Sequence, residues 1–181
     1  MNLEHHWGYV LDVAAKRLQN NKTPRHIAKY GDELEIMGAA GELAARIFLG
    51  APLEMGVHFD GGIDITYGRH NVDVKATKIT PGIAYRFLQW PIWKPVVSDI
   101  ILMTVVNIGT KHATVIGYAT RKDLESAVAN MAREVPCVEI PFVGLRAPWE
   151  LVAEKELGPS CFIVGQTKSA TRKYAELLTP T

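Results

Sequence analysis

A single globular domain with an α/β or α+β fold, in which helices flank a sheet, is predicted for this chain by three observations. Its 181 residues suit one domain with a full core. Apolar residues make up 48% and charged residues 22%, a composition typical of soluble globular proteins. Its predicted elements run in the order helix, several strands, helix and strand, which is the pattern of a sheet covered by helices.

Two helices are predicted before the first strand. Residues 3–20 carry apolar side chains at helical spacing, and the segment NNKTP ends that pattern. Asp32 is predicted to cap a second helix, with Glu35 as its capping-box partner and Gly50 at its end. The broad apolar stripe of this helix consists of Ile36, Met37, Ala40, Leu43, Ala44, Ile47 and Phe48.

Strand-like segments follow the second helix. We expect strands at 57–59, 63–67 and 72–77, with a turn at Gly68 between the last two. The segment SDIILMTVVN, residues 98–107, is almost continuously apolar, which indicates a central strand covered on both faces. HATVIGYAT, residues 112–120, is expected to form the next strand.

The rest of the chain is predicted to be mixed. Thr120 is expected to cap a helix through Asp123. We then expect a strand at CVEIPFV, a short helix near 148–157, a strand at CFIVG and a final helix from about Ser169. The apolar face of the helix capped by Thr120 would consist of Leu124, Ala127, Val128 and Met131.

The segment GGIDITYGRHNVDVKAT, residues 61–77, places charged residues inside two apolar strand-like runs. Side chains alternate across a strand, so Asp73, Lys75 and Thr77 share one face, opposite the apolar residues of the same strand. Asp64 points away from its isoleucine neighbours in the same way. If the two strands pair antiparallel, Asp64 and Asp73 can lie side by side on one face.

Two neighbouring carboxylates repel each other unless a cation lies between them. Oxygen ligands with open positions for water suit Mg²⁺ or Mn²⁺, which can polarise a phosphoryl oxygen and lower the pKa of a bound water. Lys75 can hold the attacking water or stabilise charge that develops on phosphorus. These residues make a physical case for phosphodiester hydrolysis, but the triplet alone favours the alternative of a surface salt bridge on an exposed strand.

The order of these motifs resembles the PD-(D/E)XK nuclease superfamily, which has a restriction-endonuclease-like fold. The matching segments are GAAGELAARIFLG, GGIDI and VDVKAT, followed by SDIILMTVVN and ATVIGYATRKDL. The resemblance covers about residues 32–133 and implies a mixed central sheet with an αβββαβ core. Residues 1–31 would then be a helical extension and 134–181 a C-terminal elaboration of one nuclease-like domain. Ile63 stands where the family name has proline.

The resemblance implies a role for each matching residue. Asp64 and Asp73 would be metal ligands, with the backbone carbonyl of Val74 as a third contact. Lys75 would be the catalytic lysine. Glu42 would be the helix acid that binds the metal directly or through water. The implied cofactor is Mg²⁺ or Mn²⁺, and Thr77 would support substrate or metal contacts.

Several residues near the site have competing interpretations. Glu42 lies away from the apolar stripe of its helix, among small residues, so it is either a solvent-facing acid or close to the sheet. Asp60 competes with Asp64, although an aspartate before two glycines is ordinary in a turn. His58 and His70 flank the site, and each fits a general base or a plain polar role.

Nucleic acid is the expected partner. The formal net charge of +1 does not itself indicate nucleic acid, but basic residues gather between 16 and 29 and between 69 and 94. The segment IAYRFLQWPIWKP, residues 83–95, mixes cations with aromatic residues that either stack on bases or belong to the core. The candidate nucleic-acid contacts are Thr77, Lys78, Arg86, Lys94 and Arg25.

The leading expectation is therefore a Mg²⁺-dependent nuclease that acts on DNA, without a covalent intermediate. A non-catalytic nucleic-acid-binding module with the same fold is the second class, and an unrelated α/β protein with a surface ion pair is the third. No membrane span or signal peptide is expected, and the two cysteines suggest a reducing compartment, so a cytoplasmic location is expected. The substrate form, the distinction between endonuclease and exonuclease, and pairing into a homodimer stay open.

Overall fold

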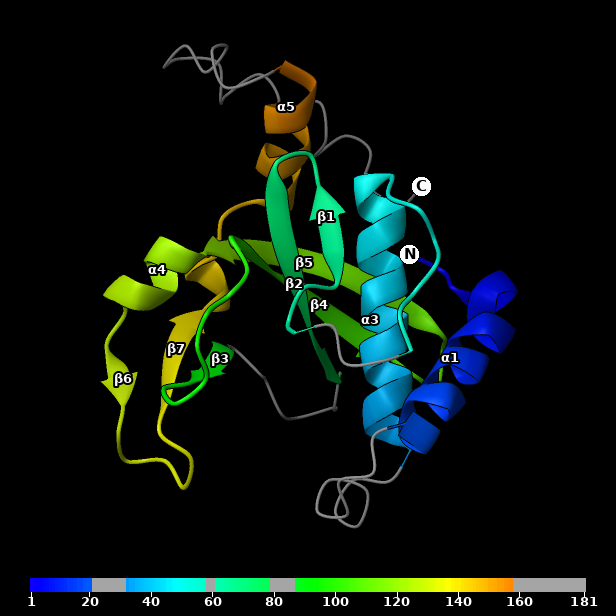
Figure 1. The fold of residues 1–181 in the computed structure, drawn as a ribbon, viewed down its shortest axis with the longest axis horizontal. Coiled ribbons are helices and arrows are strands. Elements are labelled where there is room, and N and C mark those ends of the chain that lie inside the picture. Colours follow the sequence, from blue (N-terminus) through cyan, green and yellow to red (C-terminus); the bar gives the residue numbers. More distant parts are fainter. Residues whose placement is uncertain (21–31, 58–60, 79–86, 158–181) are drawn as a thin grey trace, which may run out of the picture. The chain divides into compact units, whose positions relative to one another are not determined.

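The computed structural model describes residues 1–20, 32–57, 61–78 and 87–157 (Figure 1). The chain separates into two compact units, Met1–Pro148 and Trp149–Thr181. The predicted helix near 148–157 is confirmed as α5 (Pro148–Leu157), nearly all of which belongs to the second unit. The expected strand CFIVG and the final helix from Ser169 lie outside the described residues.

Among the described residues, two α-helices precede the first strand, as the apolar spacing predicted. A turn of 3₁₀ helix (η1, Glu4–His6) leads into α1 (Trp7–Asn20), and α3 spans Glu33–Leu49. Gly50 ends α3 in the left-handed region, with φ of 61°. The apolar faces of the two helices meet in one core that also includes Val106 and Ala113.

The capping box predicted at the start of α3 was wrong. Asp32 does precede the helix, but its backbone is already helical, with φ of −72° and ψ of −18°. A capping residue normally has extended dihedral angles, which aim its side chain at the free amides of the first turn. The Asp32 side chain accordingly makes no capping hydrogen bond.

The main sheet is mixed and has the strand order β1-β2-β4-β5. Its strands are β1 (Ile65–Tyr67), β2 (His70–Lys78), β4 (Ile100–Asn107) and β5 (His112–Thr120). β1 pairs antiparallel with β2, β2 parallel with β4, and β4 antiparallel with β5. These strands confirm four of the predicted segments. The strand expected at 57–59 is not confirmed, because Val57 is a bend and residues 58–60 lie outside the described residues.

Helix α3 packs closely on one face of the main sheet (Figure 1). A Cβ atom added at Gly41 would lie 2.5 Å from Thr104 Oγ1 and 2.6 Å from Ala76 Cβ. The absence of a side chain at Gly41 therefore permits this helix to approach β2 and β4. This close approach confirms the expectation that small residues on this side of α3 admit another element.

The other face of the main sheet is covered by a second, smaller sheet with the order β3-β7-β6. Its strands are β3 (Phe87–Pro91), β6 (Ala129–Asn130) and β7 (Cys137–Pro141). Leu88, Trp90 and Ile140 of this sheet pack against Ile101 and Met103 of β4. A mixed sheet with helices is thus confirmed, although the second face carries a sheet where a helical layer was expected. The β3 strand was not predicted.

Helix α4 (Arg121–Ser126) begins with the predicted capping box between Thr120 and Asp123. It ends earlier than expected, because Ala127 has an extended backbone with ψ of 148°. Val128 and Met131 are consequently 88% and 65% exposed, so the predicted apolar face that ran to Met131 was wrong. A 3₁₀ turn, η2 (Phe142–Gly144), follows β7. No helix among the described segments has the length and apolar character needed to cross a bilayer.

Candidate functional site

Asp73 is a buried carboxylate on β2, with a relative exposure of 2%. The parallel register places Asp73 beside Ile101 and Lys75 beside Met103, so both charged residues face the second sheet. Lys75 Nζ donates a hydrogen bond to Asp73 Oδ1. Oδ2 accepts no hydrogen bond from any described residue, and Lys94 Nζ lies 3.9 Å from it. A buried anionic oxygen without a donor is unfavourable, and a cation would stabilise it.

The ring of Trp90 lies beneath the ammonium groups of both Lys75 and Lys94. It lies on β3 and is 2% exposed. The ammonium groups of Lys75 and Lys94 lie 5.2 Å and 4.7 Å from the centroid of its ring, within the range of a cation–π interaction. Its Nε1 also donates a hydrogen bond to the main-chain carbonyl of Lys94, at 2.8 Å. Trp90 therefore fixes the positions of both cations beside Asp73.

Asp64 lies just before β1 and next to β2, the strand that carries Asp73. Its Oδ2 accepts a hydrogen bond from the Val74 amide at 2.6 Å, and its own amide donates to the Val72 carbonyl at 2.9 Å. The antiparallel register pairs Ile65 with Val72. Asp64 precedes Ile65 and Asp73 follows Val72, so the two aspartates lie on adjoining segments beside this pair. The structure thus brings Asp64 to the residue that directly follows Asp73.

Glu42 is buried, with a relative exposure of 3%, so its interpretation as a solvent-facing acid was wrong. Both of its carboxylate oxygens bind arginines: Arg17 of α1 donates to Oε2 at 2.5 Å, and Arg46 donates to Oε1 at 2.9 Å. Arg46 also donates to the carbonyl of Asp64 at 2.6 Å. Glu42 therefore contacts the Asp64 segment through a guanidinium group. Within the described ranges, no group of three or more acidic, histidine or cysteine side chains could hold a metal ion.

The remaining candidate residues are scattered. Lys78 is exposed and pairs with Glu33 at 2.8 Å, and Thr77 is partly buried on β2. His70 begins β2. His58, Asp60, Arg25 and Arg86 lie outside the described residues.

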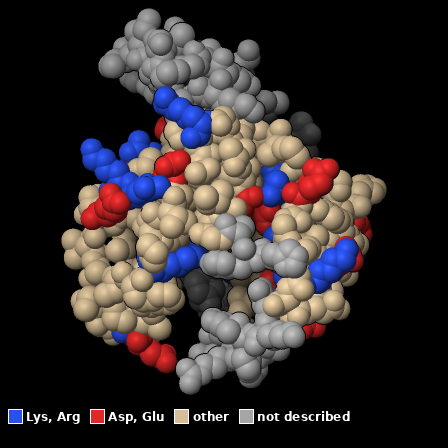
Figure 2. All heavy atoms as spheres, viewed as in Figure 1, with Lys and Arg blue, Asp and Glu red and all other residues tan. Residues whose placement is uncertain are grey.

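Charges of both signs alternate over the face seen in Figure 2. Several basic residues are paired with acids, for example Lys16 with Asp12, Arg121 with Asp99 and Arg146 with Asp123. The basic region expected between 16 and 29 is described only as far as Asn20. In the described part of the chain, Lys75 and Lys94 beside the buried Asp73 are therefore a stronger indication of function than the surface charge.

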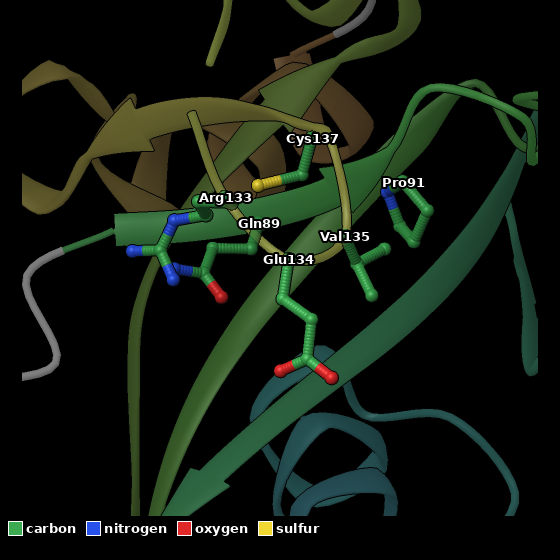
Figure 3. Close-up of a pocket in the computed structure, with 6 residues that line it drawn as sticks. All are labelled: Gln89, Pro91, Arg133, Glu134, Val135 and Cys137. Carbon is green, nitrogen blue, oxygen red and sulfur yellow. The ribbon is translucent and has the colours of Figure 1, made fainter. Parts of the chain in front are cut away.

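An open pocket of about 650 Å³ lies beside β3 and β7, and Figure 3 shows its lining residues. It is lined by Gln89, Pro91, Arg133, Glu134, Val135 and Cys137. Gln89 and Arg133 both bind Glu139, and a hydrogen bond from Asn130 lowers the pKa of that carboxyl. The lining contains none of the candidate metal ligands, so this pocket is not part of the carboxylate site.

Sequence reasoning missed the contacts of three residues that shape the site. Trp90 was assigned either to the core or to base stacking; its burial confirms the core alternative, and its contacts with two lysines were not predicted. Arg17 was considered only as part of the basic region between 16 and 29, and Arg46 was not considered. Arg46 follows Glu42 by four residues on one helix, and this spacing is an available signal for an ion pair.

Comparisons with known proteins add no assignment. No family model, no curated protein and no solved structure matches this chain.

Proposed function

We propose that this protein is a metal-dependent nuclease that hydrolyses phosphodiester bonds of DNA. The observation that supports this proposal best is the buried carboxylate of Asp73, whose Oδ2 accepts no hydrogen bond from the described residues. Such an oxygen fits a site for a cation. The low exposure of Asp73 argues against the alternative of a surface salt bridge.

The residues around Asp73 fit a small hard cation. Asp73, Asp64 and the main-chain carbonyl of Val74 would supply oxygen ligands of the kind that Mg²⁺ and Mn²⁺ prefer. When bound, the ion would polarise a phosphoryl oxygen and lower the pKa of a bound water. The third acid, Glu42, binds two arginines, and its proposed role is to position the Asp64 segment through Arg46.

The lysines contribute the remaining chemistry. Lys75 donates a hydrogen bond to one oxygen of Asp73. Its ammonium group would stabilise negative charge that develops on a phosphoryl group. Lys94, which follows β3, lies near the other oxygen of Asp73. There it would bind a phosphate oxygen as a point charge. Trp90 holds these ammonium groups in place and covers the site on one side.

A cleavage assay tests this proposal. Labelled linear and circular DNA would be incubated with Mg²⁺ or Mn²⁺, the wild-type protein, the Lys75→Met variant and the Lys122→Met variant. Lys122 is an exposed lysine on α4, so its replacement is a matched loss of one charge. We expect cleavage by the wild type and by Lys122→Met, and at least a hundredfold slower cleavage by Lys75→Met, an order-of-magnitude expectation for loss of an electrostatic stabiliser.

Two other results would contradict the proposal. Equal cleavage by Lys75→Met would show that the activity comes from another site or from a contaminant. DNA binding that needs no metal, without any cleavage by the wild type, would favour the non-catalytic binding module.

A further inference from the structure

The aromatic residues of segment 87–93 separate sharply in the structure. Trp90 is 2% exposed, whereas Trp93 is 73% exposed. A tryptophan side chain this exposed is unusual in a folded protein, because burial of its large apolar surface is favourable. Trp90 packs in the core, whereas the exposed side chain of Trp93 has no comparable packing role.

Hydrogen bonds hold the turn that carries Trp93. The Lys94 amide donates to the Pro91 carbonyl at 3.0 Å, and the Ile92 amide donates to the Pro136 carbonyl at 3.2 Å. The indole of Trp90 donates to the Lys94 carbonyl at 2.8 Å. These bonds fix the backbone on both sides of Trp93. Less conformational entropy is therefore lost when the exposed indole binds a ligand.

The same turn carries Lys94, whose ammonium group lies 3.9 Å from Asp73 Oδ2. Consecutive Cα atoms are about 3.8 Å apart, so the exposed indole begins one residue from a cation of the carboxylate site. A strand with a phosphate at Lys94 would therefore bring a neighbouring base within reach of Trp93. Phosphate contacts combined with aromatic stacking are the usual means of binding single strands.

The exposed indole of Trp93 favours unpaired bases over duplex. In a duplex, the faces of the bases are covered by their own stacked neighbours. An exposed indole gains most from a base that is already unpaired.

We propose that Trp93 stacks on an unpaired base next to the phosphate held by Lys75 and Lys94, so that the substrate is DNA with a single-stranded region. This inference rests on the proposed nuclease function. Phosphate binding by the lysines positions the strand, and the indole selects for an exposed base face.

Binding measurements test this inference. Fluorescence anisotropy would compare a labelled oligothymidine with a labelled, blunt-ended duplex of equal length, in Ca²⁺ to prevent turnover. We expect Trp93→Ala to weaken single-strand binding about 5- to 150-fold, the range for loss of one stacked base. Duplex binding should change less than about twofold, within the small effect expected of a residue that makes no stacking contact. Trp93→Phe should retain most of the affinity.

A control and an independent measurement complete the test. Val143→Ala alters another exposed apolar side chain, which is 97% exposed, and should leave both affinities unchanged. An oligonucleotide that contains 5-bromodeoxyuridine should crosslink to Trp93 of the wild-type protein on irradiation.

Unchanged single-strand binding by Trp93→Ala, or crosslinks only at other residues, would overturn the inference while the nuclease proposal stands, provided that cleavage still depends on Lys75. Absence of any DNA binding by the wild type would overturn both.

Discussion

Arg46 Nη2 donates a hydrogen bond of 2.6 Å to the main-chain carbonyl of Asp64. The same guanidinium group donates to Glu42 Oε1 and to the Pro52 carbonyl, at 2.9 Å in each case. A residue of α3 thus determines where the segment that precedes β1 lies, and with it one of the two candidate metal ligands. Glu42 acts on this segment through its ion pair with Arg46.

Replacement of Glu42 by glutamine tests this structural role. It would leave the side chains of Arg17 and Arg46, which are 16% and 10% exposed, without a negative partner. Loss of one partner of a buried ion pair costs about 3–5 kcal/mol, so we expect a decrease in the free energy of unfolding of roughly that size. Urea unfolding would measure it, with the exposed Glu125→Gln as control. Equal stability of Glu42→Gln and wild type would contradict this role and return Glu42 to the candidate ligands.

The close contact of α3 with the sheet predicts opposite effects for two glycines of one helix. Gly41→Ala would place its Cβ atom 2.5 Å from Thr104 Oγ1, so we expect a loss of about 1–3 kcal/mol from overpacking. Gly38→Ala meets nothing within 4 Å and should stabilise the helix by about 0.5–1 kcal/mol. Thermal unfolding of both variants would check the difference. A Gly41→Ala variant as stable as Gly38→Ala would contradict the contact.

Asp123 should contribute to acid unfolding. Hydrogen bonds from Arg146 hold the pKa of this carboxyl well below its ordinary value, and bonds from Thr120 act in the same direction. A depressed pKa in the folded state adds stability that is present above the unfolded pKa of about 3.9 and is lost as the pH falls toward the folded pKa. Urea unfolding from about pH 6 to about pH 2 should therefore show a smaller decrease for Asp123→Asn. An identical slope for both proteins would exclude Asp123 as a source of this dependence.

Lys94 is expected to bind phosphate without taking part in metal binding. Each phosphate contact on a single strand contributes about 0.7 to the slope of log affinity against log salt concentration. We expect Lys94→Met to reduce the magnitude of that slope by about this amount, and Lys122→Met to leave it unchanged. A salt titration of oligothymidine binding measures the slope. No change in slope for Lys94→Met would mean that its ammonium group does not contact DNA.

Local patterns were enough to predict the elements that surround the site. Strict alternation predicted β2, continuous apolar sequence predicted β4, and the Thr120 capping box predicted the start of α4. Each depends on neighbouring residues alone. The end of α4 could not be read in the same way, because apolar spacing continued to Met131 after the backbone had left the helix at Ala127.

The second sheet depends on pairing between distant segments. β3 pairs with β7, so that Phe87 meets Pro141 and Trp90 meets Val138. No local pattern in a proline-rich aromatic segment specifies that partner. For the same reason the sequence could not distinguish the buried Trp90 from the exposed Trp93, or show that Lys94 approaches Asp73.

The most direct test of the account is Mn²⁺ binding by the wild-type protein, measured by calorimetry beside the Asp73→Asn and Asp64→Asn variants. Asp123→Asn serves as a control for loss of a carboxylate elsewhere, and circular dichroism verifies that each variant is folded. We expect saturable binding by wild type and control, and at least about tenfold weaker binding when either Asp73 or Asp64 is replaced. Wild-type protein that binds no Mn²⁺, or folded Asp73→Asn that binds it equally well, would contradict a cation site at Asp73.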